Sequence, residues 1–137
     1  MQKSKALHAI IIVAITVIAL IISLPYSYTS GPIWPDGQRY TFNGILVHDM
    51  VRDRACLTPV QYATQFYSKY PATNLPYGPP FLAVVFALAF GLFNISFFIA
   101  RCVIAFHLVL AALAFFYLII YFTKSYRCAA LSVLAFL

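Results

Sequence analysis

The sequence has very little charge and no glutamate at all. Only 9% of its 137 residues are charged and 64% are hydrophobic, whereas a typical soluble domain is about one quarter charged and about half apolar. A chain of this size has a large surface for its volume, so it cannot hide so much apolar area from water. The composition therefore excludes an ordinary soluble domain and predicts an integral membrane protein.

The acidic residues are few and lie close together in the sequence. Nine Lys and Arg against three acids give a formal charge of +6. The acids are Asp36, Asp49 and Asp53, so any acid–base or metal chemistry must take place in that segment. The basic residues are scattered in small groups, which is typical of membrane flanks and differs from the continuous basic face that binds nucleic acid. No nucleic-acid partner is predicted.

The cysteines and glycines also exclude several kinds of site. Cys56, Cys102 and Cys128 lack the spacing of metal ligands, and two of them fall in apolar runs, where cysteine usually acts as a small hydrophobe. The sequence contains no glycine-rich phosphate loop and no internal repeat. It therefore predicts neither a structural disulfide nor a phosphate-binding loop.

Two apolar runs are long enough to be transmembrane helices. Residues 6–25 and residues 97–122 each supply the roughly 20 residues that are needed to cross a hydrocarbon core of about 30 Å. Lys3 and Lys5 precede the first run, so a secretory signal peptide is the alternative interpretation of it. The length of the run and the absence of a small-residue cleavage site favour a transmembrane helix.

Residues 26–79 form a polar loop between these runs. The loop contains six of the eight prolines, and an interior proline breaks a helix, so the loop cannot be one long helix. Residues 38–52 lack proline and carry Phe42, Ile45, Leu46 and Met50 at helical spacing. This pattern predicts an amphipathic helix on the membrane surface, with Asp36 just before it as a possible cap.

Residues 80–93 are apolar, but at about 21 Å as a helix they are short for a membrane crossing. If they cross, the basic turn around Lys124 and Arg127 lies opposite Lys3 and Lys5. If they form an interfacial or re-entrant helix, both basic groups are cytoplasmic, as the positive-inside rule favours. The sequence therefore predicts a multi-pass protein of the cell inner (plasma) membrane, with a cytoplasmic N-terminus and residues 26–93 outside.

The predicted fold class is all-α. Residues 1–137 make a single domain of polytopic membrane helices with a long external loop that contains short membrane-surface helices. Residues 128–137 begin a further helix. Because that apolar run ends after ten residues, we expect the chain to be the N-terminal fragment of a longer protein and inactive alone.

Several sequence elements occur in an order that resembles a known family. They are WPDGQRY at residues 34–40, the amphipathic stretch after it, YGPPF at residues 77–81, and GLFNIS at residues 91–96 followed by Arg101. The combination resembles the first external loop of the GT-C superfamily of lipid-linked-sugar glycosyltransferases, in the branch of the protein O-mannosyltransferases and lipid A aminoarabinose transferases. Many relatives carry Asp-Glu where this chain has Asp36-Gly37, so one carboxylate is missing.

The resemblance implies that a sugar moves, with inversion, from a polyprenyl-phosphate-linked donor to an extracytoplasmic lipid, glycan or protein acceptor. Such a transfer needs a base for the acceptor hydroxyl, and the resemblance gives this role to Asp36. It places Arg101 at the outer end of a span, where a cation stabilises the leaving phosphate. The alternative interpretations are a helix cap for Asp36 and an interfacial anchor for Arg101.

Other residues of the loop are candidates for binding the donor phosphate or the acceptor, namely Arg39, Tyr40, His48 and Asp49. We expect His48 and Asp49 to point to different faces of their helix, so no metal site is predicted. No cofactor is firmly predicted either, and a divalent metal remains an open alternative. The tyrosines of the loop, Tyr62, Tyr67, Tyr70 and Tyr77, suit either stacking on sugar rings or an interfacial belt.

A function of another class also fits this sequence. A small non-enzymatic subunit of a transporter or assembly complex has the same membrane helices but no need for a catalytic acid. Reading the gene beyond Leu137 distinguishes the two, because a glycosyltransferase of this kind has many more apolar spans.

Overall fold

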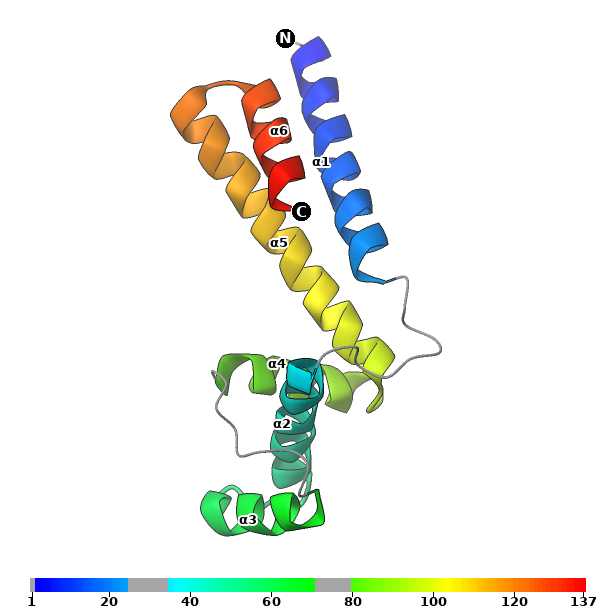
Figure 1. The fold of residues 1–137 in the computed structure, drawn as a ribbon, viewed down its shortest axis with the longest axis vertical. Coiled ribbons are helices and arrows are strands. Elements are labelled where there is room, and N and C mark those ends of the chain that lie inside the picture. Colours follow the sequence, from blue (N-terminus) through cyan, green and yellow to red (C-terminus); the bar gives the residue numbers. More distant parts are fainter. Residues whose placement is uncertain (1, 25–34, 71–79) are drawn as a thin grey trace. The chain divides into compact units, whose positions relative to one another are not determined.

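The computed structural model describes residues 2–24, 35–70 and 80–137, and within these ranges it contains six α-helices and no strand (Figure 1). The all-α part of the predicted fold is therefore confirmed. The chain divides into two compact units. Unit 1 comprises residues 1–26 and 104–137, and unit 2 comprises residues 27–103.

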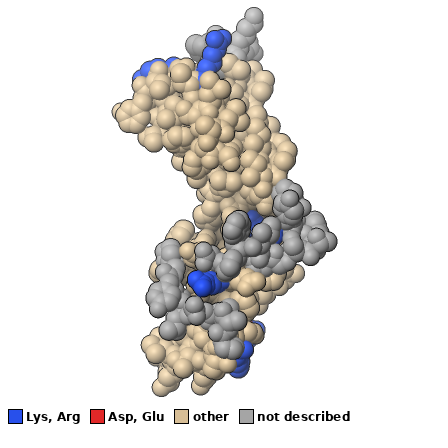
Figure 2. Space-filling view, viewed as in Figure 1, with Lys and Arg blue, Asp and Glu red and all other residues tan. Residues whose placement is uncertain are grey.

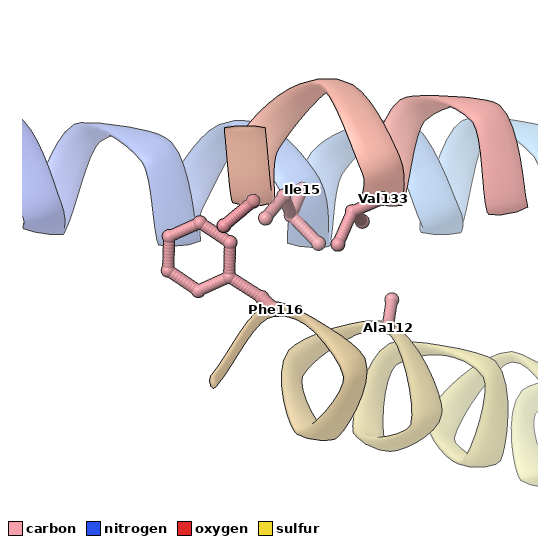
Figure 3. Packing of buried hydrophobic residues seen from close by; sticks show 5 residues of the cluster. Ile15, Ala112, Phe116 and Val133 are labelled. Atoms are coloured by element: carbon pink, nitrogen blue, oxygen red, sulfur yellow. The ribbon is translucent and has the colours of Figure 1, made fainter. Parts of the chain in front are cut away.

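Unit 1 is built from three helices. They are α1 (Gln2–Ser23), the part of α5 (Phe97–Thr123) that follows residue 103, and α6 (Tyr126–Phe136). Phe116 of α5 is fully buried, and it packs with Ile15 of α1 and Val133 of α6 (Figure 3). Buried alanines, Ala112 and Ala129, complete the cluster and leave room for the helices to approach closely, as is common in membrane helix packing.

Among the helices that the structure describes, two are long and apolar enough to cross a membrane, Ala6–Ser23 within α1 and Phe97–Thr123, which is α5. Only 11% and 17% of their most apolar windows are buried, whereas the core helix of a soluble protein is mostly buried. In the view of Figure 2, the described basic side chains of unit 1 lie at the end that carries the α5–α6 turn. These features are compatible with a membrane protein.

The α5–α6 turn has a defined local structure. Lys124 adopts a left-handed backbone with φ of 55° and leads the chain out of α5. The Ser125 hydroxyl accepts a hydrogen bond of 3.4 Å from the backbone N–H of Cys128 and so caps α6. Helix α6 therefore begins at Tyr126, two residues earlier than the sequence predicted.

Unit 2 is organised around α2 (Pro35–Arg52), which crosses α4 (Pro80–Leu92) at Gly44. A Cβ atom at Gly44 would collide with the Cβ of Phe86 and lie 3.2 Å from the ring of Phe90. The absence of a side chain is therefore what allows the close crossing. Phe86 and Phe90 form one buried cluster with residues from the first turns of α5, namely Ala100 and Val103.

The opposite side of α2 packs against α3 (Pro59–Lys69). Leu46 contacts a cluster that contains Phe66 and Tyr67 of α3. The Tyr67 hydroxyl also donates a buried hydrogen bond of 2.5 Å to the side-chain oxygen of Asn43. The apolar residues that predicted a membrane-surface helix are therefore largely covered by protein on both sides of α2.

Helix α3 was not predicted from the sequence. Its signals are nevertheless present: Pro59 stands at the first turn, where proline is tolerated, and apolar or aromatic residues then recur at helical spacing. The residues with this spacing are Tyr62, Ala63, Phe66 and Tyr67. The tyrosines of this segment were interpreted as an interfacial belt or as sugar-stacking residues, and their helical spacing was not used.

Candidate functional site

The predicted catalytic acid belongs to the first turn of α2. The helix begins at Pro35, so Asp36 lies inside it and not just before it, as the sequence predicted. Proline fits the first helical position because it lacks the N–H that would have no partner there. The side chain of Asp36 lies outside the described part of the chain, as does the YGP element at residues 77–79.

Three of the predicted binding residues belong to unit 2, as the start of α2 does. Tyr40 packs against the cluster that holds Phe86 and Ala100. Arg101 follows Ala100 directly in the first turns of α5 and is half-buried, while Arg39 is exposed on α2. The apolar cluster therefore connects the N-terminal half of α2 with the turn of α5 that carries Arg101.

His48 and Asp49 lie at the other end of α2. The helix is continuous from Asp36 to Asp49, and thirteen residues at about 1.5 Å each separate the two backbone positions by about 20 Å. The five predicted site residues on α2 therefore divide into two groups. Asp36, Arg39 and Tyr40 belong to the N-terminal half of α2, and His48 and Asp49 belong to its last two turns.

The prediction that His48 and Asp49 point apart was wrong. The Nδ1 atom of His48 lies 3.0 Å from Oδ1 of Asp49, and both side chains are largely buried, with 18% exposed. Adjacent helical positions are about 100° apart, but the flexible torsions of two short polar side chains turn them toward each other. Within the residues that the structure describes, no three His, Cys or acidic side chains gather as a metal site would require.

Asp49 and Asp53 are joined by Arg52 at the end of α2. Arg52 Nη1 lies 3.2 Å from Asp49 Oδ1, and Arg52 Nε donates a hydrogen bond of 3.0 Å to Asp53 Oδ1. The hydroxyl of Tyr62 on α3 donates a hydrogen bond of 2.6 Å to the other oxygen of Asp53. These four residues and His48 form a network that we call the α2 terminal cluster.

A left-handed turn places Asp53 within reach of α3. Arg54 has a φ of 55°, and the N–H of Ala55 donates a hydrogen bond of 2.9 Å to the carbonyl of Met50. This arrangement ends a helix in the way that a glycine usually does. The chain then reverses toward α3, and the Asp53 carboxylate meets Tyr62.

Contacts within the α2 terminal cluster shift the pKa values of Asp53, Arg52 and Tyr62. The hydrogen bond from Arg52, followed by that from Tyr62, lowers the pKa of Asp53 below its ordinary value. The bond to Asp53 raises the pKa of Arg52, and it raises the pKa of Tyr62 to about 12. At neutral pH Asp53 is therefore an anion that accepts two hydrogen bonds, and Tyr62 is a neutral donor.

Two hollows flank the end of α2. One is a polar cleft of ≈ 320 Å³ between α2 and α3. The other is an apolar groove of ≈ 360 Å³ between α2 and α4. The cleft is lined by Asp49, Arg52, Asp53, Tyr62, Gln65, Phe66, Lys69 and Tyr70. The groove is lined by Val47, His48, Val51, Arg52, Val84, Ala87, Leu88, Gly91 and Leu92.

Sequence reasoning missed Arg52 and Asp53 as site residues. The spacing of Asp49 and Arg52, three residues apart on a helix, was the available signal, because such pairs lie on one face. The contact between Asp53 and Tyr62 had no local signal, since it needs both α3 and the turn at Arg54. All three cysteines are free, in agreement with the absence of a predicted disulfide.

Comparison of the chain with protein-family models, with curated proteins and with solved structures finds no match.

Proposed function

We propose that this chain serves in a membrane glycosyltransferase that moves a sugar from a polyprenyl-phosphate donor to an extracytoplasmic acceptor. One observation carries the proposal beyond the sequence resemblance. Tyr40 of α2 and Ala100 of α5 pack in a single apolar cluster, so the helical turns that carry Asp36 and Arg101 belong to the same compact unit. A base and a phosphate-binding cation must work within one site.

In the proposed reaction the carboxylate of Asp36 takes the proton of an acceptor hydroxyl. The hydroxyl oxygen attacks the anomeric carbon of the sugar from the face opposite the phosphate, which inverts that carbon. The bond between the anomeric carbon and the phosphate oxygen breaks, and polyprenyl phosphate leaves as an anion. Arg101 stabilises that anion, and Arg39 and Tyr40 bind the donor phosphate or the acceptor beside it.

The same proposal includes an orientation in the inner (plasma) membrane, with a cytoplasmic N-terminus and several passes. It is supported by the exposed apolar surfaces of α1 and α5, and by the Lys124 and Arg127 pair at the end of α5. The loop that contains the exposed Cys56 is then extracytoplasmic. This orientation presents α2 and α3 to an external acceptor.

The orientation is tested with a variant that keeps Cys56 as its single cysteine. A membrane-impermeant thiol reagent should label Cys56 in intact cells to the same extent as in opened cells. Matched single-cysteine variants with Cys128 should react only after the membrane is opened, because that residue follows the basic turn. Protection of Cys56 in intact cells would place the loop in the cytoplasm and overturn the orientation.

The catalytic role is tested with Asp36→Asn in the full gene product. The amide keeps the size of the side chain and part of its capping ability but removes the base. If Asp36 is the base, sugar transfer from a polyprenyl-phosphate donor should fall by about 10²-fold or more while donor binding is kept. Asp49→Asn, about 20 Å away along α2, should cost less.

The same pair of variants separates the base from a simple helix cap. Loss of a cap costs on the order of 1 kcal/mol of stability and leaves turnover largely intact. Near-normal transfer by purified Asp36→Asn protein would therefore exclude Asp36 as the base. A shared loss in both variants, together with reduced stability, would point to a structural role.

A further inference from the structure

We propose that the polar cleft between α2 and α3 binds a neutral, hydroxyl-rich ligand of the carbohydrate class. The cleft is formed entirely within unit 2, by the last turn of α2 and by α3. Its volume of ≈ 320 Å³ lies at the lower end of the range of roughly 300–1,000 Å³ that is usual for small-molecule sites. The inference goes beyond the proposed transfer reaction and does not depend on it.

The charges that line the cleft favour a ligand without net charge. Two carboxylates, Asp49 and Asp53, face two cations, Arg52 and Lys69, so the lining is formally balanced. A phosphate or a sugar acid placed here would approach both carboxylates, and an amine would approach both cations. Either charged ligand therefore meets a repulsion that offsets its attraction.

The hydrogen-bonding groups of the cleft are held in place before a ligand arrives. Arg52 and Tyr62 fix the Asp53 carboxylate from two sides, with distances of 3.0 Å and 2.6 Å. A carboxylate has about four lone-pair sites, so each acid keeps acceptor capacity for hydroxyl groups. Gln65 adds an amide that both donates and accepts. Alternating donors and acceptors match the adjacent hydroxyls of a sugar.

Aromatic side chains supply the apolar part of the lining. The ring of Phe66 is buried and its centroid lies 5.1 Å from that of Tyr70, so Tyr62 and Tyr70 present the accessible aromatic surface of the cleft. The C–H faces of a pyranose ring are apolar and lose contact with water when they pack on such rings. The lining thus combines polar groups for the hydroxyls with aromatic groups for the ring faces.

The cleft is separate from the proposed catalytic acid. Asp49 lies about 20 Å from Asp36 along the continuous helix α2. A monosaccharide in the cleft therefore does not reach the first turn of α2. We infer that the cleft recognises a sugar without acting on it.

The test is binding of methyl glycosides to the complete chain, measured by saturation-transfer NMR. The probes are methyl α-mannopyranoside, methyl β-glucopyranoside and methyl β-galactopyranoside, with glucuronate, glucosamine and inorganic phosphate as charged comparisons. The protein is held in a detergent without a sugar headgroup, because a maltoside would compete for the cleft. At least one neutral glycoside should give saturable binding at pH 7, and it should bind more tightly than every charged comparison.

Two neighbouring glutamines provide a matched pair of variants. Gln65 lines the cleft, whereas Gln61, one turn earlier on α3, is exposed and does not line it. Loss of one neutral hydrogen bond should weaken glycoside binding about five-fold in Gln65→Ala. Gln61→Ala should bind as the unchanged protein does. Both positions are on the surface, so both variants should fold.

Three results would each overturn the proposal. The first is no saturable binding of any neutral glycoside. The second is equal binding by Gln65→Ala and the unchanged protein. The third is tighter binding of phosphate or glucuronate than of the neutral sugars, which would assign the cleft to an anion.

Discussion

The two units of the chain use different means to hold their helices together. In unit 1 a fully buried Phe116 packs among aliphatic residues and alanines, and the outward surfaces are apolar. Unit 2 has a glycine crossing at Gly44, a buried Asn43–Tyr67 hydrogen bond and the α2 terminal cluster. The acids whose side chains the structure describes, Asp49 and Asp53, both belong to unit 2.

The apolar outward surfaces of unit 1 are compatible with a lipid environment. In lipid, apolar surface gives no driving force for helix association, so close packing of small and large side chains must hold unit 1. Polar networks at a water-facing surface can be satisfied by the protein and by water together. Each of the following substitutions tests one of the two units.

Phe116→Ala should have the largest effect and should act on unit 1. The residue is fully buried, and removal of a buried phenylalanine ring costs about 3–5 kcal/mol in protein cores, with the lower end expected in lipid. Unfolding in mixed micelles should show this loss, and hydrogen exchange should rise in α1 and α6. Phe122→Ala, in the same helix but 71% exposed, is the control and should change little.

Gly44→Ala should weaken unit 2 at the crossing of α2 and α4. The added methyl group collides with the Cβ of Phe86, and overpacking of this kind costs about 1–3 kcal/mol. Gly91→Ala should instead stabilise the protein, because alanine favours a helix more than glycine does. A new Cβ at Gly91 has ordinary contact with the ring of His48, at 3.9 Å. Thermal unfolding of both variants measures the difference in stability between them. Equal stability of the two variants would contradict the claim that the α2–α4 crossing excludes a side chain at Gly44.

Tyr67→Phe should cost about 1–2 kcal/mol, because it leaves the buried side-chain oxygen of Asn43 without its donor. Tyr62→Phe removes a hydroxyl that donates to the exposed Asp53, where water can replace it, so its cost should be smaller. Chemical denaturation of the two variants provides the comparison. A larger loss for Tyr62→Phe would show that the surface network, and not the buried bond, joins α2 to α3.

The smallest effect is expected from pH, and it should be confined to unit 2. The pKa of Asp53 is lowered, so its stabilising contribution is present above its ordinary value of 3.8 and is lost as pH falls through its lower folded value. The pKa of Tyr62 is raised from 10.0 to about 12, so its contribution is complete below pH 10 and is lost as pH rises through about 12.

Ultraviolet titration of tyrosinate, compared between the unchanged protein and Tyr62→Phe, isolates the late-titrating phenol. In Asp53→Asn that phenol should titrate closer to 10, because the largest cause of its raised pKa is the bond to Asp53. An unchanged titration in Asp53→Asn would contradict the hydrogen bond between the two residues.

Sequence reasoning identified the helices whose signal is local. Long apolar runs and regular spacing predicted helices that begin or end within a few residues of α1, α2, α4 and α5. Features that depend on distant partners were not accessible. Gly44 only weakens a helix when it is considered alone, and its role as a crossing point needs Phe86, some forty positions later in the chain.

The candidate site was predictable as a set of residue types but not as an arrangement. The resemblance gave the role of base to Asp36, and Arg39, His48 and Asp49 follow it within thirteen positions of the sequence. In a helix each residue advances the chain by about 1.5 Å, so residues that are near in sequence can lie far apart in space. The pairing of Asp53 with Tyr62 also required a left-handed Arg54, a conformation that sequence rules assign to glycine.

Helix α2 is continuous from the proposed catalytic acid, Asp36, to Asp49, which lines the cleft. The helical rise places the backbone positions of Asp36 and Asp49 about 20 Å apart along it. A ligand that engages the cleft at one end and reaches Asp36 at the other must therefore have a minimum length, and a shorter one can occupy only one end. If Asp36 is the base and the cleft binds a sugar, as proposed, glycan chains shorter than that span should be bound but left unmodified.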